Sequence, residues 1–180
     1  MRIFAEDTAA VFIDFQEKLM PAIEGKDEII AKAAILAKGL REIGVPVAVT
    51  QQYTKGLGDT VPAMKEALGE FTPMDKTSFS ALGSKEFVEW LKAQGKSTLL
   101  ICGAETHICV LQTIIDLAQG GFRVFIVADC VGSRKNYNRD FGIERAVQEG
   151  AFVTTCETAL FELVKGAGSP HFKAISKLIK

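Results

Sequence analysis

Residues 97–119 read STLLICGAETHICVLQTIIDLAQ, a short apolar run followed by an amphipathic pattern. The run Leu99–Cys102 ends at Gly103, which is typical of a strand buried on both faces of a parallel sheet. From Ile108 onward, apolar residues recur at helical spacing. The stretch therefore predicts a strand, a tight turn and a helix, with Cys109 in the first helical turn above the carboxyl end of the strand.

Cys109 would occupy an electrostatically special position in this arrangement. We expect Thr106 to cap the helix, and unpaired amide groups in a first turn favour an anion. A thiol at such a site can have its pKa lowered below about 8.5, which predicts more thiolate near neutral pH. The motif alone fits a small buried hydrophobic residue better, since most cysteines are structural.

Apolar runs and amphipathic stretches alternate along the rest of the chain. We expect strands at 8–14, 45–50, 122–128 and 151–155, and helices at 26–43, 63–68, 85–94, 141–149, 159–164 and 172–179. The stretch 72–82 lacks either periodicity and is expected to be a loop. The alternation predicts an α/β fold, a Rossmann-like three-layer α/β/α sandwich with a mainly parallel sheet of about six strands. We expect one domain over residues 1–180.

The composition is that of a globular protein and excludes several classes of partner. The chain has 180 residues, 48% of them hydrophobic, and a net charge of −1 without long charged blocks. Neither nucleic acid nor a membrane surface is therefore expected as a partner. No apolar run approaches about 18 residues, and the acidic N-terminal stretch does not fit a signal peptide, so we expect a cytoplasmic protein.

The cysteines and histidines bear on redox state and metal binding. The four cysteines form no CxxC pair, which favours reduced thiols in a cytosolic protein. With only two histidines and no matching cysteine-histidine spacing, we expect no metal site.

Polar residues follow several of the predicted strands. In open parallel sheets, ligands bind outside the carboxyl ends of the strands, where Asp14, Gln51, Gln52, Cys109 and Asp129 would gather. Asp129 fits a loop cap better than a catalyst, and the two glutamines could be ordinary solvated loop residues.

A thiolate nucleophile needs a proton acceptor and a charge partner. Asp14 can supply the first and Lys76 the second. His107 lies only two residues before Cys109 and would project differently, while His171 near the C-terminus fits a surface residue at a helix start. A cysteine-histidine protease arrangement is therefore disfavoured.

Three motifs occur in order along the chain: VFIDFQ around Asp14, DKTSFSAL around Lys76 and GAETHICVLQT around Cys109. Together they resemble the isochorismatase-like cysteine hydrolase family over nearly the whole length. The stretches QQYTKGLGDTVP, VADCVGSR and PHFKAISKLIK are similar to those of the isochorismatase domain-containing proteins within it.

The resemblance implies the isochorismatase-like hydrolase fold and a catalytic triad of Asp14, Lys76 and Cys109. It also implies a cis peptide bond between Ala104 and Glu105, with an oxyanion hole formed by the N–H groups of Glu105 and Cys109. In the implied reaction, a small amide or related C–N substrate is cleaved without a cofactor. Asp14 accepts the thiol proton and later protonates the leaving group, while Lys76 balances the charge.

This sequence differs from other branches of the superfamily, and the differences narrow the expected metal content and substrate. Nicotinamidases of this superfamily carry a metal cluster where this chain has Gln51-Gln52-Tyr53, so no metal is expected. True isochorismatases lack the nucleophilic cysteine, so the family name does not imply isochorismate as substrate. The candidate substrate-binding residues are Phe15, Gln52, Tyr53, Phe79 and His107, and ordinary packing would explain the aromatic residues and the histidine equally well.

Two other functions remain open. One is an isochorismatase-type enol-ether hydrolase in which Asp14 donates a proton and Cys109 is a bystander. The other is a non-catalytic binding protein that keeps the fold. The family resemblance also implies a homo-oligomer, for which the apolar helix at 172–179 is a candidate contact, although packing on its own domain would explain it equally well.

Overall fold

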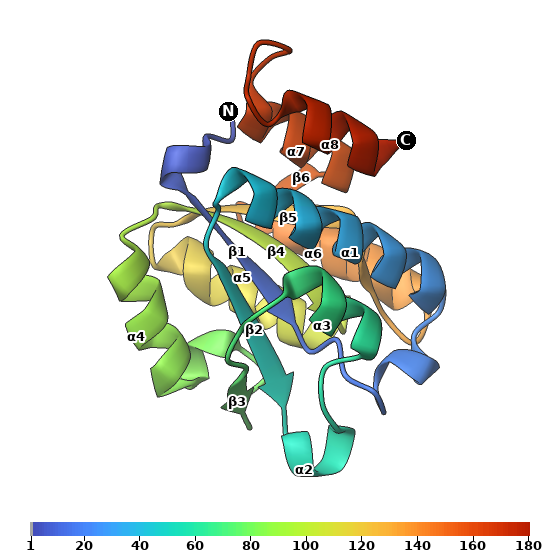
Figure 1. Ribbon diagram of the computed structural model, residues 1–180. Helices are drawn as coiled ribbons and strands as arrows, with labels where there is room; N and C mark the ends of the chain where they lie inside the picture. The colour runs from blue at the N-terminus through green and yellow to red at the C-terminus, as the bar shows by residue number, and fades with distance from the viewer. Residues whose placement is uncertain (1) are drawn as a thin grey trace.

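The computed structural model describes residues 2–180 and is built around a six-stranded sheet in which every pair of neighbouring strands is parallel (Figure 1). The order across the sheet is β3-β2-β1-β4-β5-β6. The strands are β1 (Thr8–Ile13), β2 (Val47–Gln52), β3 (Met74–Lys76), β4 (Thr98–Ala104), β5 (Arg123–Gly132) and β6 (Phe152–Thr154). The expected parallel sheet of about six strands is confirmed.

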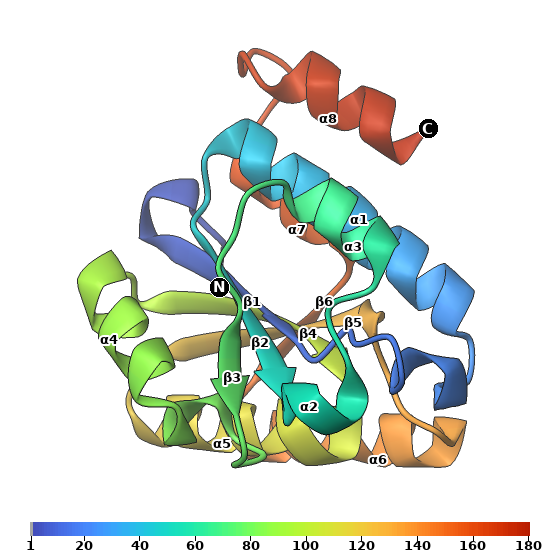
Figure 2. The same ribbon diagram turned by 60° about the horizontal axis from the view of Figure 1, so that its bottom comes forward.

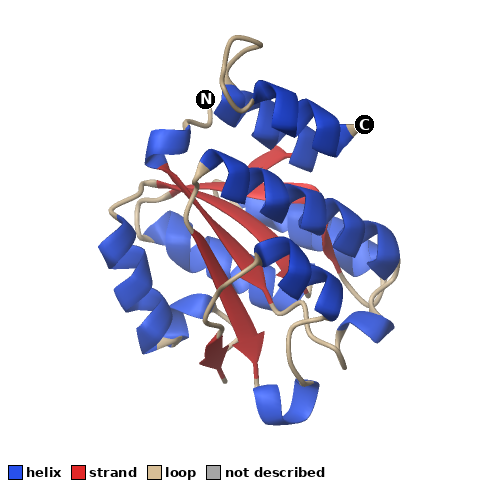
Figure 3. Cartoon of the chain, in the orientation of Figure 1, coloured by secondary structure: helices blue, strands red, loops and turns tan. Residues whose placement is uncertain are grey.

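Helices cover both faces of this sheet (Figure 3). They are α1 (Lys26–Ile43), α2 (Thr54–Leu57), α3 (Pro62–Leu68), α4 (Lys85–Gln94), α5 (Leu111–Gln119), α6 (Asn136–Gln148), α7 (Cys156–Val164) and α8 (Phe172–Ile179). In Figure 2, α1, α3 and α7 lie above the sheet with α8 outermost, and α5 and α6 lie below it. The result is the three-layer α/β/α arrangement that the alternating pattern predicts.

The two central strands form the middle of the hydrophobic core. Every residue of β1 and β4 is buried, as expected for strands covered on both faces. Phe12, Leu100 and Ile101 have no exposed surface, and burying a side chain of this size contributes about 1.5–3 kcal/mol. This core holds the ends of β1 and β4 side by side, with Ile13 opposite Gly103.

Gly103 is required where β1 and β4 end. Its φ is 141°, and a Cβ atom placed there would collide with the carbonyl oxygen of Ile13. Only glycine therefore allows the two strands to approach this closely just before the chain leaves each of them.

Several elements differ from the sequence-based expectation, among them α2, which was not predicted, and α6, which begins at Asn136 rather than Phe141. The stretch 72–82, predicted to be a loop, contains the edge strand β3 and a 3₁₀ turn at Ala81–Gly83. Strand β5 runs on to Gly132, whereas a loop was expected from Asp129 onward. β3 was missed because the short polar segment MDK has no apolar run to mark it. Within residues 2–180, no helix has the length and apolar character needed to cross a membrane.

Candidate active site

The candidate site lies at the carboxyl ends of β1, β3 and β4, the lower edge of the sheet in Figure 1. The chain leaves β1 toward β2 on one side, and leaves β4 toward β5 on the other. Such a switch point opens a crevice at the strand ends. Asp14 directly follows β1, Lys76 ends β3, and Cys109 lies in the turn after β4.

Asp14 and Lys76 form a buried ion pair at the base of this crevice. The distance from Lys76 Nζ to Asp14 Oδ2 is 2.7 Å, and neither side chain is exposed. The Thr50 hydroxyl donates a hydrogen bond of 2.8 Å to the other carboxylate oxygen. Asp14 has a φ of 56°, a left-handed conformation that aspartate tolerates better than most residues. This backbone turn directs the chain away from β1 as soon as the strand ends.

Lys76 is held by neutral oxygens as well as by Asp14. Its ammonium group donates to Gln52 Oε1 at 2.7 Å and to the Phe79 carbonyl at 3.1 Å. The Gln52 side chain is fixed in turn by a bond of 2.9 Å from its amide nitrogen to the Thr77 carbonyl. The amide of Gln52 therefore orients the lysine that neutralises Asp14.

The Cys109 thiol adjoins this pair. Its Sγ lies 3.9 Å from Gln52 Oε1, and the residue is 6% exposed. The pKa of Cys109 is raised to about 12, chiefly by burial and also by the nearby charge of Asp14, while Lys76 opposes the shift. Burial also raises the pKa of Asp14, against the effect of Lys76. The raised pKa of Cys109 favours the protonated thiol at neutral pH.

This finding corrects the expectation of a lowered thiol pKa. The sequence identifies the helix that follows Cys109 but not the depth at which the thiol lies. Desolvation disfavours the thiolate more strongly than the local positive groups favour it.

The turn that carries Cys109 is a π-helical segment, Thr106–Val110, rather than the first turn of an α-helix. Thr106 does not cap it: within residues 2–180 its buried hydroxyl has no hydrogen-bond partner, and Glu105 occupies the N-cap position without a side-chain capping bond. The peptide bond between Ala104 and Glu105 is cis, as the resemblance implies. The Glu105 carboxylate accepts a bond of 2.8 Å from Arg134 Nε.

A small cavity opens onto the thiol and encloses about 120 Å³. It is lined by Asp14, Leu19, Gln52, Leu57, Phe79, Glu105, Ile108 and Cys109. Two of the predicted substrate-binding residues, Gln52 and Phe79, line it. The aliphatic walls Leu19, Leu57 and Ile108 were not foreseen, because they come from separate segments that only the fold brings together.

The other three predicted substrate-binding residues lie elsewhere. Phe15 is in the core beside Phe12, with ring centroids 6.2 Å apart. Tyr53 is 56% exposed at the start of α2. His107 bonds to the Ser133 hydroxyl at 3.0 Å and lines a separate cavity beside α6.

Two polar residues expected at this edge have structural contacts instead. Gln51 is buried and donates to the Thr60 hydroxyl at 2.9 Å. The Asp129 carboxylate accepts a bond of 2.8 Å from the Cys156 N–H at the start of α7, the capping role that the sequence favoured, although from within β5. Neither lines the cavity at Cys109.

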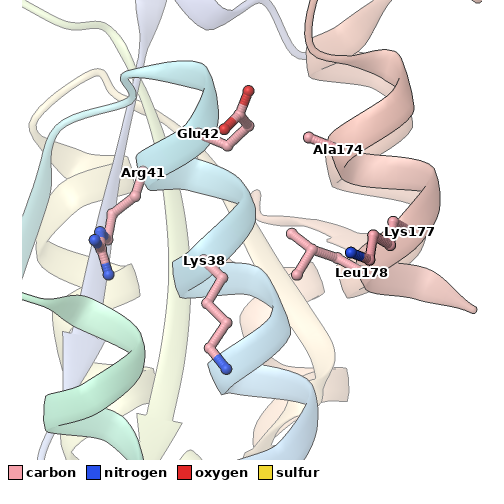
Figure 4. Close-up of a pocket in the computed structure, with 6 residues that line it drawn as sticks. All are labelled: Lys38, Arg41, Glu42, Ala174, Lys177 and Leu178. Atoms are coloured by element: carbon pink, nitrogen blue, oxygen red, sulfur yellow. The ribbon is translucent and has the colours of Figure 1, made fainter.

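A larger cavity of about 630 Å³ lies between α1 and α8 (Figure 4). Its walls are Lys38, Arg41, Glu42, Ala174, Lys177 and Leu178. None of these carries a thiol or hydroxyl nucleophile, and the cavity shares no residue with the Cys109 site. Helix α8 packs on its own domain here, with Ile175 fully buried and His171 3.1 Å from Glu42.

The four cysteines are free thiols. Among residues 2–180, no three histidine, cysteine, aspartate or glutamate side chains gather in a way that could hold a metal ion.

Comparison with known proteins identifies relatives that align with nearly the whole chain. The Isochorismatase domain family matches residues 8–158. The secreted isochorismatase effector Isc1 of Phytophthora sojae is 40% identical over 183 aligned positions, which cover 99% of this chain and 83% of that protein. Isochorismatase domain-containing protein 2A of Mus musculus is 38% identical over 182 positions, covering 99% and 85%. The solved structure of the MAR1 ribonuclease from Caenorhabditis elegans superposes with a TM-score of 0.94 at 40% identity, covering 99% of this chain and 92% of that one.

Proposed function

The chain belongs to the isochorismatase family of hydrolases, and we propose that it cleaves the C–N bond of a small amide with Cys109 as nucleophile. The observation that carries the proposal is the placement of the Cys109 thiol in one cavity with a buried carboxylate that is paired with Lys76. A buried acid-base pair next to a nucleophile in a cavity is typical of nucleophilic catalysis.

In the proposed first half-reaction, Asp14 takes the proton of the Cys109 thiol while the sulfur attacks the amide carbonyl carbon. The raised pKa of Asp14 suits this step, because it brings the carboxylate closer to the thiol in proton affinity. The carbonyl oxygen becomes an oxyanion, which the N–H groups of Glu105 and Cys109 would stabilise. Asp14 then gives the proton to the departing nitrogen, and ammonia or an amine leaves with a thioester on Cys109.

In the second half-reaction, Asp14 removes a proton from water, and the resulting hydroxide attacks the thioester. The bond to sulfur breaks, the thiol regains its proton from Asp14, and a carboxylic acid is released. Lys76 keeps Asp14 ionised at the start of each half-reaction, since its positive charge opposes the effect of burial. No metal or cofactor has a role in this scheme.

The two alternatives from the sequence leave features of the site without a role. In an enol-ether hydrolase, Asp14 would donate a proton to the substrate and the Cys109 thiol in the cavity wall would do nothing. A non-catalytic binding protein would not need a buried ion pair beside that thiol. The cysteine mechanism uses all three groups.

A solved relative is called a ribonuclease, which makes RNA a necessary comparison substrate. Proteins bind nucleic acid largely through cationic groups that contact phosphates. Here Lys76 is buried and already hydrogen-bonded, and the net charge of the chain is −1. These features favour an uncharged substrate over RNA.

The experiment is a turnover screen of the purified protein over small amides, with ammonia release as the readout. An enol ether and a single-stranded RNA serve as comparison substrates. The proposal predicts ammonia release from at least one amide and no cleavage of the other two. Cleavage of RNA or the enol ether without any amide turnover would contradict it.

We further propose a homo-oligomer. Apolar side chains are exposed on two neighbouring elements, Tyr137 and Phe141 on α6 and Phe152 and Val153 on β6, and such surfaces suit contacts between subunits. Light scattering should give a mass above that of the 19.5 kDa chain, and a clean monomer at micromolar concentration would contradict this proposal.

One domain over the whole chain and a cytoplasmic location remain predictions, and a related protein is described as secreted.

A further inference from the structure

We infer that the substrate is a small amide without a net charge and with a compact aliphatic acyl group. The inference rests on the proposed amide hydrolysis at Cys109 and adds the class of substrate. Three features of the cavity carry it: its size, its walls and the charges around it.

The cavity at Cys109 is small. Its volume of about 120 Å³ is well below the roughly 300–1,000 Å³ of sites that hold drug-sized ligands. An amide with a few carbon atoms can therefore reach the thiol, whereas an aromatic ring or a sugar would need the walls to move.

The walls around the thiol are largely apolar. Leu19 comes from the segment after β1, Leu57 from α2 and Ile108 from the π-helical turn. The Phe79 ring adds an aromatic wall, and that residue is 52% exposed. These side chains favour an aliphatic substituent, because apolar surface removed from water contributes about 25 cal/mol per Å².

The charges at the cavity disfavour an anionic substituent. Two of its lining residues, Asp14 and Glu105, are acidic. The neighbouring cation Lys76 already donates to Asp14 and to neutral oxygens, and Arg134 is paired with Glu105. A substrate carboxylate would thus lose its hydration, and both cations beside the cavity already face a carboxylate of the protein.

A cationic substituent is disfavoured for a different reason. The Glu105 carboxylate accepts from both the backbone N–H and the guanidinium of Arg134, so its charge is already compensated. Asp14 is likewise paired with Lys76, so an amine in the cavity would lose its hydration beside two carboxylates that already have cationic partners. The cavity therefore selects a neutral acyl group, which also excludes isochorismate with its two carboxylates.

The test compares amides of matched size and different charge. Isovaleramide and malonamate have equal numbers of non-hydrogen atoms, as do butyramide and 3-aminopropanamide. We expect kcat/KM for each neutral amide to exceed that of its charged partner by about 100-fold or more, since a site without a partner for a charged group rejects it strongly. Phenylacetamide, which is larger, should be a poor substrate. Equal turnover of neutral and charged partners, or efficient turnover of phenylacetamide, would overturn the inference while leaving amide hydrolysis intact.

A second measurement tests the effect of ligand charge in the cavity and does not depend on turnover. Iodoacetamide and iodoacetate have nearly the same shape, so their alkylation rates at Cys109 report the effect of charge. The ratio of the two rates should exceed that for a free thiol in solution by about tenfold or more, because burial penalises the carboxylate. Leu57→Lys should reduce this preference by placing a cation in the wall, and Leu57→Met, which keeps the wall neutral, should retain it.

The two measurements separate the inference from the proposed function. If no amide is hydrolysed but Cys109 still prefers iodoacetamide, then amide hydrolysis fails and selection of a neutral ligand stands. If the alkylation ratio equals that of a free thiol and Leu57→Lys leaves it unchanged, the inference is wrong whatever the turnover screen finds.

Discussion

The ammonium nitrogen of Lys76 lies 2.7 Å from a carboxylate oxygen of Asp14, with both side chains fully buried. Neither charge has water to solvate it, so each depends on the other and on the hydrogen bonds from Thr50 and to Gln52. The pair connects the end of β1 to the end of β3, two strands that do not touch each other in the sheet. It therefore serves both the fold and the proposed chemistry.

The first prediction concerns the stability of this pair. Lys76→Met should lower the free energy of unfolding by about 3–5 kcal/mol at neutral pH, because it leaves a buried carboxylate uncompensated. The loss should shrink at lower pH, where Asp14 takes up a proton and becomes neutral. Urea denaturation at two pH values measures both effects.

The control is the double variant Asp14→Asn/Lys76→Met, which removes both charges. It should be clearly more stable than the sum of the single losses predicts. Additivity within about 0.5 kcal/mol would show that the two groups do not stabilise each other.

The second prediction concerns the pH dependence of turnover. Asp14 must be ionised to accept the thiol proton, and its pKa lies above the usual value of about 3.9 because it is buried. Activity should therefore fall as the pH falls, with its acidic limb above pH 4. The pKa of Cys109 is about 12, so no loss from thiol deprotonation is expected at moderately alkaline pH. A kcat/KM profile with an alkaline limb at pH 8–9 that tracks Cys109 alkylation would contradict this assignment.

The third prediction concerns thiol reactivity. Cys109 should be alkylated before the other three cysteines, since it alone among them lines the cavity. Because the thiolate is the reactive form and the pKa is about 12, the alkylation rate should keep rising with pH to about pH 10. Peptide mapping after iodoacetamide treatment gives both results. A rate that levels off below pH 9 would indicate a thiolate already formed near neutral pH.

The fourth prediction concerns Gln52. Its side-chain carbonyl accepts a hydrogen bond from the Lys76 ammonium group. Gln52→Leu should lower kcat by about 10- to 100-fold, because a hydrogen bond to a charged group contributes about 1.5–3 kcal/mol. Gln51→Leu on the same strand is the matched control. Its side chain bonds to Thr60 away from the cavity, so that variant should lose stability without a comparable loss in kcat. Equal effects of the two variants on kcat would show that Gln52 has no specific positioning role.

The sequence predicted the core of the fold because β1 and β4 are continuous apolar runs, and it placed Asp14 and Cys109 at one sheet edge because both follow such runs. Strand β3, which ends in Lys76, was not predicted. Its three residues pair with β2 through backbone groups, which leave no apolar pattern. Lys76 was proposed as the charge partner of the thiolate on chemical grounds, and the family resemblance then implied its place in the triad.

The chemistry of the site was harder to predict than its location. Desolvation, which raises the pKa of Cys109, depends on how many atoms from distant segments surround the sulfur. The positions of Leu19 and Leu57 in the cavity wall also depend on the fold, because α1 and β2 lie between these two residues in the sequence. A local pattern carries no signal for such contacts.

Ammonia release from a small neutral amide by Cys109→Ala, beside the wild type and Cys156→Ala, tests the central claim most directly. Cys156 is buried at the start of α7 and lines no part of the cavity, and alanine suits a helix, so Cys156→Ala controls for the loss of a thiol elsewhere. Thermal denaturation would verify that each variant is folded. The account predicts no turnover above background for Cys109→Ala and near wild-type turnover for Cys156→Ala. Full activity in folded Cys109→Ala, on a substrate that Asp14→Asn cannot process, would contradict the nucleophile assignment.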